Sequence, residues 1–202
     1  MTDRFADLKK IPDEPAARVL ARENTELSVK LDSPASAPVP AVLQELEDKG
    51  ATLDMIRLLS VALPARERVW WACLAAKELS EKTDVPPTPT LAAAEAWVFE
   101  PTEANQERAR TAIQTAGVND DFVHCATGVL YATDTLGPGE LKEYPAPPGV
   151  GAVSAFTMNI LALRAHGEDM ERYQQRIIDR ALDIARGGNG RLTPKGAAEE
   201  GE

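Results

Sequence analysis

The sequence predicts an all-α protein, a compact single-domain bundle of about eight helices. From residue 40 to residue 186, apolar residues recur with helical spacing, and Pro or Gly separates one segment from the next. A chain of 202 residues, 44% of them hydrophobic, is long enough to bury one substantial core. The 27% of charged residues is ordinary for a folded domain and argues against a disordered chain.

The expected helices have recognisable start and stop residues. A short helix is predicted at 13–23, where Pro15 occupies the first turn. The helix predicted at 40–50 ends at Gly50, a residue that suits the left-handed position after a helix. The remaining predicted helices span residues 52–62, 63–79, 88–99, 102–117, 119–133, 152–166 and 168–186.

The two ends of the chain differ in composition from the helical part. Residues 41–186 are expected to form the domain, and residues 1–40 an irregular N-terminal arm that ends in a Pro/Ala/Ser linker. Residues 187–202 contain too few apolar side chains to form a core of their own, and we expect a mobile tail there.

Within the arm, Leu27, Val29 and Leu31 alternate with polar residues, which is the period of a β-strand. The segment could dock on the helical domain in an extended conformation. It could instead pair with an edge strand of another protein, because a lone strand leaves its backbone groups without partners. The sequence leaves both interpretations open.

The helix predicted at 63–79 has no polar side in its central turns. The apolar side chains that surround its axis include Val69, Trp70, Trp71, Cys73 and Leu74. A helix that is apolar all round, and too short to span a membrane, is expected to be surrounded by protein. Trp70 and Trp71 point about 100° apart, so they are predicted to be core residues rather than one flat aromatic platform. Arg66 and Glu67, at the charged start of this helix, are candidates for contact with water or a partner.

The helix predicted at 152–166 has the same all-round apolar character, and we expect it to lie in the centre of the bundle as well. The expected core residues outside the first central helix are Trp97, Phe156, Ile160, Leu163 and Ile177.

The charge and the absence of apolar spans restrict the partners. A formal net charge of −10 disfavours binding to nucleic acid and to anionic membrane surfaces, which attract Lys and Arg. The apolar runs are shorter than the roughly 20 residues that cross a bilayer. The first ten residues, MTDRFADLKK, lack the apolar stretch of a secretory signal. We therefore expect a cytoplasmic protein that binds neither nucleic acid nor membrane.

Motifs that carry catalysis or bind cofactors are weak in this sequence. Cys73 and Cys125 fall in apolar helical stretches and are expected to be buried free thiols. His124 is adjacent to Cys125, but neighbouring helical side chains diverge and do not readily share a metal or a proton. The segment GVGAVS at 149–154 precedes a helix, yet it lacks the strand and the GK[ST] ending of phosphate-binding loops. We predict no catalytic residue, no cofactor and no metal.

A line of three residues on the helix predicted at 119–133 has two interpretations. His124, Gly128 and Tyr131 follow an i, i+4, i+7 spacing, so the glycine leaves a notch between two ring side chains. Close packing of another helix over Gly128 would fill the notch. Alternatively, the notch is a small pocket or a partner contact.

The run LPARERVWWACLAA resembles a motif of an uncharacterised family of bacterial all-helical proteins, a domain of unknown function. The pattern is Leu-Pro-x-Arg-Glu-x-Val-Trp-Trp-Ala-Cys, which corresponds here to Leu63 through Cys73. The segment EAWVFEPTEANQERA at 95–109 is also similar, and the resemblance covers roughly residues 40–186. Such proteins are loosely associated with type VI secretion gene neighbourhoods. The resemblance implies a cytoplasmic accessory role, as an adaptor or chaperone, and it brings no catalytic residues with it.

These observations together predict a non-enzymatic protein-interaction module, such as an adaptor, chaperone or accessory protein, with a protein partner still to be identified. The alternative is a small helical enzyme or ligand-binding protein with a site assembled between helices. The oligomeric state does not follow from the sequence.

Overall fold

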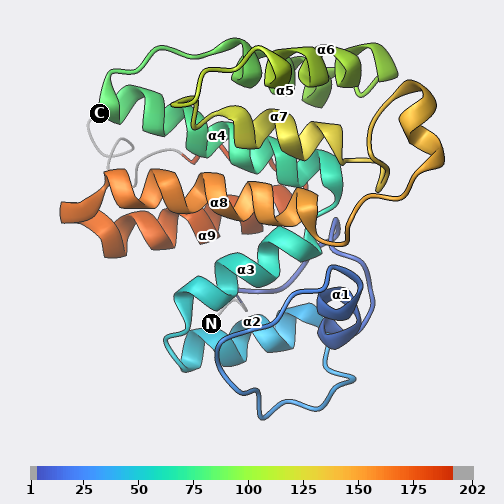
Figure 1. Ribbon diagram of the computed structural model, residues 1–202. Coiled ribbons are helices and arrows are strands. Elements are labelled where there is room, and N and C mark those ends of the chain that lie inside the picture. The colour runs from blue at the N-terminus through green and yellow to red at the C-terminus, as the bar shows by residue number, and fades with distance from the viewer. Residues whose placement is uncertain (1–3, 193–202) are drawn as a thin grey trace, which may run out of the picture.

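The computed structural model describes residues 4–192, and within this range it is an all-α protein without a β-strand (Figure 1). This confirms the predicted fold class. The described residues form nine α-helices and two short 3-10 helices, η1 (Gly139–Glu143) and η2 (Gly167–Asp169). The α-helices are α1 (Ala16–Arg22), α2 (Val39–Asp48), α3 (Thr52–Ala62), α4 (Ala65–Thr83), α5 (Pro89–Phe99), α6 (Glu103–Gln114), α7 (Val123–Leu130), α8 (Val150–Ala165) and α9 (Met170–Arg186).

Helix α4 lies at the centre of the larger group of helices. It packs against α5, α7, α8 and α9, which is the environment that its all-round apolar sequence requires. Helices α1, α2 and α3 form a smaller group on one side, and α3 joins this group to α8 and α9 (Figure 1). One contiguous set of buried side chains runs through both groups. Within residues 4–192, no helix is long and apolar enough to cross a bilayer.

The N-terminal arm is part of this structure. Phe5, Leu8 and Ile11 are buried, and α1 adds further side chains to the same core. The expected strand at 25–33 is wrong, because the structure has no strand in the described chain.

Two carboxylates explain why the backbone of residues 25–33 does not need a strand partner. The amides of Ser28 and Val29 donate hydrogen bonds to Asp54 Oδ2 over 2.8 and 2.9 Å. Glu45 accepts hydrogen bonds from the amides of the last two residues of the segment. Leu27, Val29 and Leu31 are partly buried against the core, which is the docked arrangement of the two that the sequence left open.

The segment that follows α9 is packed against the helices as far as it is described. Gly187 ends α9 in the left-handed region with φ 102°. The Gly190 amide donates to Asp183 Oδ2 over 2.8 Å, and its carbonyl accepts from Arg180 Nε over 3.1 Å. The prediction of a mobile tail from residue 187 is therefore wrong for residues 187–192. The rest of that prediction, residues 193–202, lies outside the described residues.

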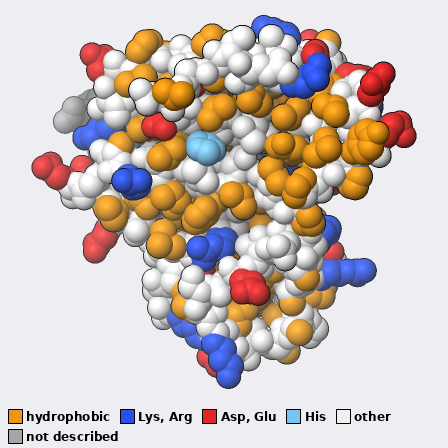
Figure 2. Space-filling model, in the orientation of Figure 1, with side chains coloured by type: hydrophobic (Ala, Val, Ile, Leu, Met, Phe, Trp, Pro, Cys, Tyr) orange, Lys and Arg blue, Asp and Glu red, His pale blue; other side chains and the backbone are white. Residues whose placement is uncertain are grey.

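Helix α8 is only partly inside, which corrects the expectation that it is surrounded by protein. Val153 is 58% exposed, and Phe156 and Ile160 are partly buried, whereas Leu163 is buried as predicted. Figure 2 shows hydrophobic side chains gathered along the band of the surface where α7 and α8 lie. The helical wheel could not show this, since apolar side chains on every side do not reveal which sides other helices cover.

Candidate functional site

The two adjacent tryptophans of α4 have different surroundings. Trp71 is fully buried, and its indole Nε1 donates a hydrogen bond to the Ile177 carbonyl of α9 over 3.1 Å. The other expected core residues that are buried are Val69, Cys73, Leu74, Trp97, Leu163 and Ile177.

Trp70 is not a core residue, and the expectation that no side of α4 faces solvent is wrong. Its side chain is partly exposed, and its indole Nε1 donates over 2.7 Å to the carbonyl of Asn189, in the segment after α9. The Phe99 ring lies 5.9 Å from the Trp70 ring, centroid to centroid, at an angle of 60°. Phe99 itself is 68% exposed, which is unusual for so large an apolar side chain.

These two rings form one side of a groove with a volume of about 360 Å³, which we call the Trp70 groove. Its walls come from the start of α4, the end of α5, the segment after α9 and one residue of the N-terminal arm. The lining residues include Lys10, Arg66, Glu67, Trp70, Val98, Phe99, Gly188, Asn189 and Arg191.

The Trp70 groove is cationic in a strongly acidic protein. The guanidinium carbon of Arg191 lies 5.5 Å from the Trp70 ring centroid. Arg66 Nε donates to the Val98 carbonyl over 2.7 Å, which fixes this side chain beside the rings. Among the described residues that line the groove, the one acid, Glu67, is paired with Lys10 over 3.0 Å. Positive charge therefore dominates in this groove, although the chain as a whole carries −10.

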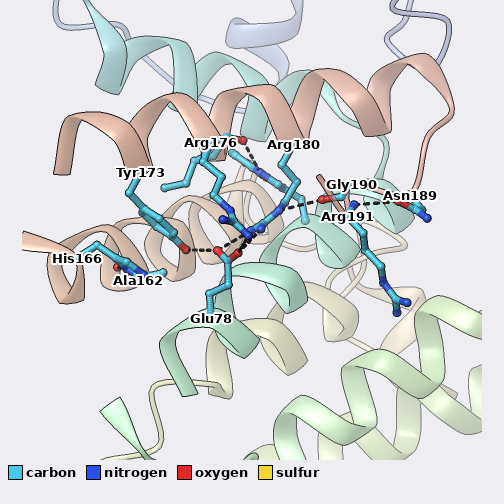
Figure 3. A network of polar contacts seen from close by, with 11 residues as sticks. Glu78, Ala162, His166, Tyr173, Arg176, Arg180, Asn189, Gly190 and Arg191 are labelled. Atoms are coloured by element: carbon cyan, nitrogen blue, oxygen red, sulfur yellow. Dashed lines mark hydrogen bonds and ion pairs between the residues drawn. The ribbon is translucent and has the colours of Figure 1, made fainter. Parts of the chain in front are cut away.

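A polar network holds the segment that forms one wall of the groove (Figure 3). Glu78 of α4 accepts two hydrogen bonds from Arg180, over 2.5 and 3.1 Å, and one from the Tyr173 hydroxyl over 2.7 Å. Arg176 completes an ion pair with the same carboxylate over 2.6 Å. Because Arg180 also donates to the Gly190 carbonyl, the network ties α4 and α9 to the segment that carries Asn189 and Arg191.

The carboxyl group of Glu78 is held ionised by this network. Burial alone would raise the pKa of Glu78, but the hydrogen bonds and charges of Arg180, Tyr173 and Arg176 outweigh burial and place the pKa below its ordinary value. Beside the network, the His166 ring stacks on Tyr173 at 3.8 Å, nearly parallel to it. The charged groups of Glu78, Arg176 and Arg180 bind one another, so we assign this network a structural role.

The structure does not bring His124, Gly128 and Tyr131 to the Trp70 groove. A Cβ atom on Gly128 would lie 3.2 Å from Val69 Cγ2, so α4 fills the notch that the sequence suggested. His124 is half-buried, and this burial lowers its pKa, with the charge of Asp121 acting in the opposite direction. Tyr131 lines a different pocket, near the start of α8.

The cysteines have the character of packed thiols. Cys73 and Cys125 are both buried and free. The neighbouring Cys125 thiol and burial raise the pKa of Cys73 well above its ordinary value, so it stays protonated and is a poor nucleophile. Among the residues that the structure describes, no three His, Cys, Asp or Glu side chains come together to hold a metal ion.

Sequence reasoning found part of the groove and missed the rest. Arg66 and Glu67 were expected at a contact surface, and both line the groove. Phe99, Asn189 and Arg191 were not anticipated. Phe99 belongs to the apolar run AWVF, in which no period separates an inner from an outer side. Asn189 and Arg191 lie in a Gly-rich stretch whose folding depends on contacts with α4 and α9.

Comparison with curated proteins gives no match, and comparison with solved structures gives none either. A family profile does match, over residues 42–185, which is more than half of the chain and runs from within α2 almost to the end of α9. The matched range includes the Leu63–Cys73 motif, Phe99 and the Glu78–Arg180 network. The chain thus belongs to the Family of unknown function (DUF6931).

Proposed function

We propose that this protein is a non-enzymatic protein-interaction module and that a partner protein docks in the Trp70 groove. The observation that carries the proposal is the exposed Phe99 ring beside the partly exposed Trp70 ring, in a groove flanked by arginines. Aromatic residues and arginine are the side chains that contribute most to protein–protein binding, especially where they line a concave surface.

The charge of the groove indicates the chemistry of the occupant. Arg66 and Arg191 flank the rings, and neither forms an ion pair with an acidic side chain in the described part of the chain. An acidic segment with one aromatic or large aliphatic residue complements this arrangement, because its apolar residue contacts Trp70 and Phe99 while its carboxylates meet the guanidinium groups.

The cellular role is part of the same proposal. The resemblance of the Leu63–Cys73 motif to proteins near type VI secretion genes supports an adaptor, chaperone or accessory protein of such a machine, acting in the cytoplasm. The partly exposed apolar side of α8, around Val153 and Phe156, offers a second surface for a multi-protein assembly.

A quantitative affinity purification from the native host tests the proposal. Wild-type protein, Phe99→Ser and Tyr144→Ser serve as baits, and bound proteins are measured by mass spectrometry. Tyr144 is the matched control, since it is an exposed ring, 58% accessible, outside the groove. We expect a stoichiometric partner with the wild type and with Tyr144→Ser, and at least about a tenfold loss with Phe99→Ser.

A charge-reversal variant tests the chemistry of the occupant. Arg191→Glu leaves the aromatic rings in place but reverses the charge beside them. The recovered partner should bind this variant more weakly, and its affinity for the wild type should fall as salt rises. If wild type and Phe99→Ser recover the same proteins in equal amounts, the Trp70 groove is not the docking site.

A further inference from the structure

The last described residues of the chain form a wall of the Trp70 groove. Gly190 is fixed by the hydrogen bonds of its amide and its carbonyl (Figure 3). The Arg191 amide donates to Asn189 Oδ1 over 2.9 Å, and the Arg191 guanidinium lies over the Trp70 ring. Leu192, the next residue, is partly buried. The sequence beyond residue 192 therefore continues from the edge of the groove.

That continuation is acidic. Residues 193–202, TPKGAAEEGE, contain three glutamates and one lysine, and we call them the acidic segment. The glutamates are Glu199, Glu200 and Glu202. Seven residues lead from Leu192 to Glu199, and such a stretch spans at most about 25 Å when fully extended. This length is enough to cross a groove with a volume of about 360 Å³.

The charges of the groove suit these glutamates. Arg66 and Arg191 line the groove and are exposed, and neither is paired with an acidic side chain within residues 4–192. Over most of a chain that carries −10, an added carboxylate would meet other carboxylates and be repelled. The Trp70 groove instead offers it two guanidinium groups, which form strong hydrogen bonds to carboxylates.

We propose that the acidic segment binds in the Trp70 groove of its own chain and competes there with the partner protein. The glutamates at 199 and 200 meet the guanidinium groups of Arg66 and Arg191. Because the segment is joined to the groove wall, its effective concentration at the groove is of millimolar order. The competition rests on the proposed function of the groove, whereas binding of the segment rests on charge and reach alone.

The segment is built to be displaced. It contains no aromatic and no large aliphatic residue, so it matches the arginines but offers nothing to the exposed Phe99 ring. Ion pairs at an exposed surface are weak and are screened by salt. A partner that combines acidic residues with an apolar side chain would therefore replace it, and the segment would exclude acidic sequences that lack such an anchor.

The Trp70 indole N–H signal reports on occupancy of the groove by NMR. Full-length wild type is compared with a variant that carries Glu199→Gln, Glu200→Gln and Glu202→Gln, and the signal is assigned with Trp70→Phe. We expect the signal to differ between the two proteins at low salt and to coincide in 0.5 M sodium chloride, since screening releases the segment. Identical signals at low salt would overturn the proposal.

A charge-matched control separates binding from a general change in net charge. Glu140→Gln, Glu143→Gln and Glu168→Gln together remove the same charge from exposed positions outside the groove. This control should leave the Trp70 indole signal where the wild type has it. A shift as large as that of the segment variant would contradict the proposal. A shift that grows with protein concentration would also contradict it, because the segment would then bind a second copy of the chain.

An added peptide tests the chemistry of the occupant. N-acetylated and C-amidated TPKGAAEEGE, titrated into the segment variant, should move its Trp70 indole signal toward the wild-type position. The same peptide with its three glutamates changed to glutamine should have no such effect. Wild type should bind the acidic peptide at least about twofold more weakly than the segment variant does, because its own segment occupies the groove. Equal affinities would overturn the proposal.

The partner assay then tests the competition separately. With the segment variant as bait, the partner recovered through the Trp70 groove should bind at least about twofold more tightly than with wild type. Unchanged partner affinity would overturn the competition. If Phe99→Ser does not affect any recovered protein but the peptide experiment succeeds, the proposed function fails while binding of the acidic segment stands.

Discussion

Two sides of one helix, α4, differ in what covers them. Trp71 points toward the middle of α9 and is sealed, with its indole N–H bonded to the Ile177 carbonyl. Trp70, one residue earlier, is partly exposed and lies against Phe99, Lys77 and the short segment after α9. Both side chains are equally apolar, so composition does not distinguish them. The difference teaches that an apolar helix surface becomes core only where another helix lies over it, and otherwise remains available to a partner.

The largest expected effect comes from truncating the sealed side. Trp71→Ala should lower the free energy of unfolding by about 3–5 kcal/mol, because it removes a fully buried ring and an indole hydrogen bond. Trp70→Ala should cost less than about 2 kcal/mol, since its ring is already partly solvated. Urea unfolding of both variants measures the difference, and equal losses would erase the distinction between the two sides.

A second effect concerns the network that holds the wall of the Trp70 groove. Glu78→Gln should cost about 3 kcal/mol at pH 7, because Arg180 is buried and loses its anionic partner. The pKa of Glu78 is lower in the folded protein than its ordinary value of 4.5. The network's stabilisation is therefore complete above about pH 4.5 and is lost as pH falls through the folded pKa.

Unfolding experiments between pH 3 and pH 8 check this dependence. The stability gap between wild type and Glu78→Gln should be constant above about pH 5 and should shrink toward pH 3. Glu171→Gln, at an exposed position near the start of α9, is the matched control and should show little gap at any pH. A gap that persists unchanged at pH 3 would show that the carboxylate charge is not what holds the network together.

A smaller effect is expected on a third side of α4, where Val69 meets Gly128 of α7. Gly128→Leu should destabilise the protein by about 1–3 kcal/mol through overpacking, since even a Cβ would lie 3.2 Å from Val69 Cγ2. Partner binding per folded molecule should not change, because this side is closed. Loss of binding without loss of melting temperature would instead make the notch a contact surface.

The positions of the helices could be predicted well from the sequence. The contacts that each segment makes with distant parts of the chain could be predicted only in part. Nearly every helix could be placed from Pro and Gly positions and apolar spacing, as with Pro89 at the start of α5 and Thr102 at the start of α6. The interpretation of residues 25–33 as a strand was wrong because Asp54 and Glu45, from later helices, accept the backbone hydrogen bonds. Such long-range acceptors cannot be inferred from a local period.

The candidate site was harder to predict for a related reason. Arg66 and Glu67 were identifiable as the charged start of an apolar helix, and both line the groove. The opposite wall depends on Arg180 reaching Gly190 and Glu78 at once, which brings Asn189 beside Trp70. The Glu78–Arg180 and Trp70–Asn189 contacts join residues 102 and 119 positions apart, and the sequence around Gly190 is rich in glycine. Helical periodicity carries no information about them.

Fluorine NMR of protein labelled with 5-fluorotryptophan tests the central claim most directly. The three tryptophan signals are assigned with Trp70→Phe and Trp71→Phe, and a neutral, soluble paramagnetic agent is then added. We predict that the Trp70 signal broadens at the lowest concentration of the agent, while the Trp71 signal stays sharp because its ring is fully buried. A Trp70 signal as protected as that of Trp71 would mean that both sides of α4 are core, and it would contradict the assignment of the Trp70 groove as a docking surface.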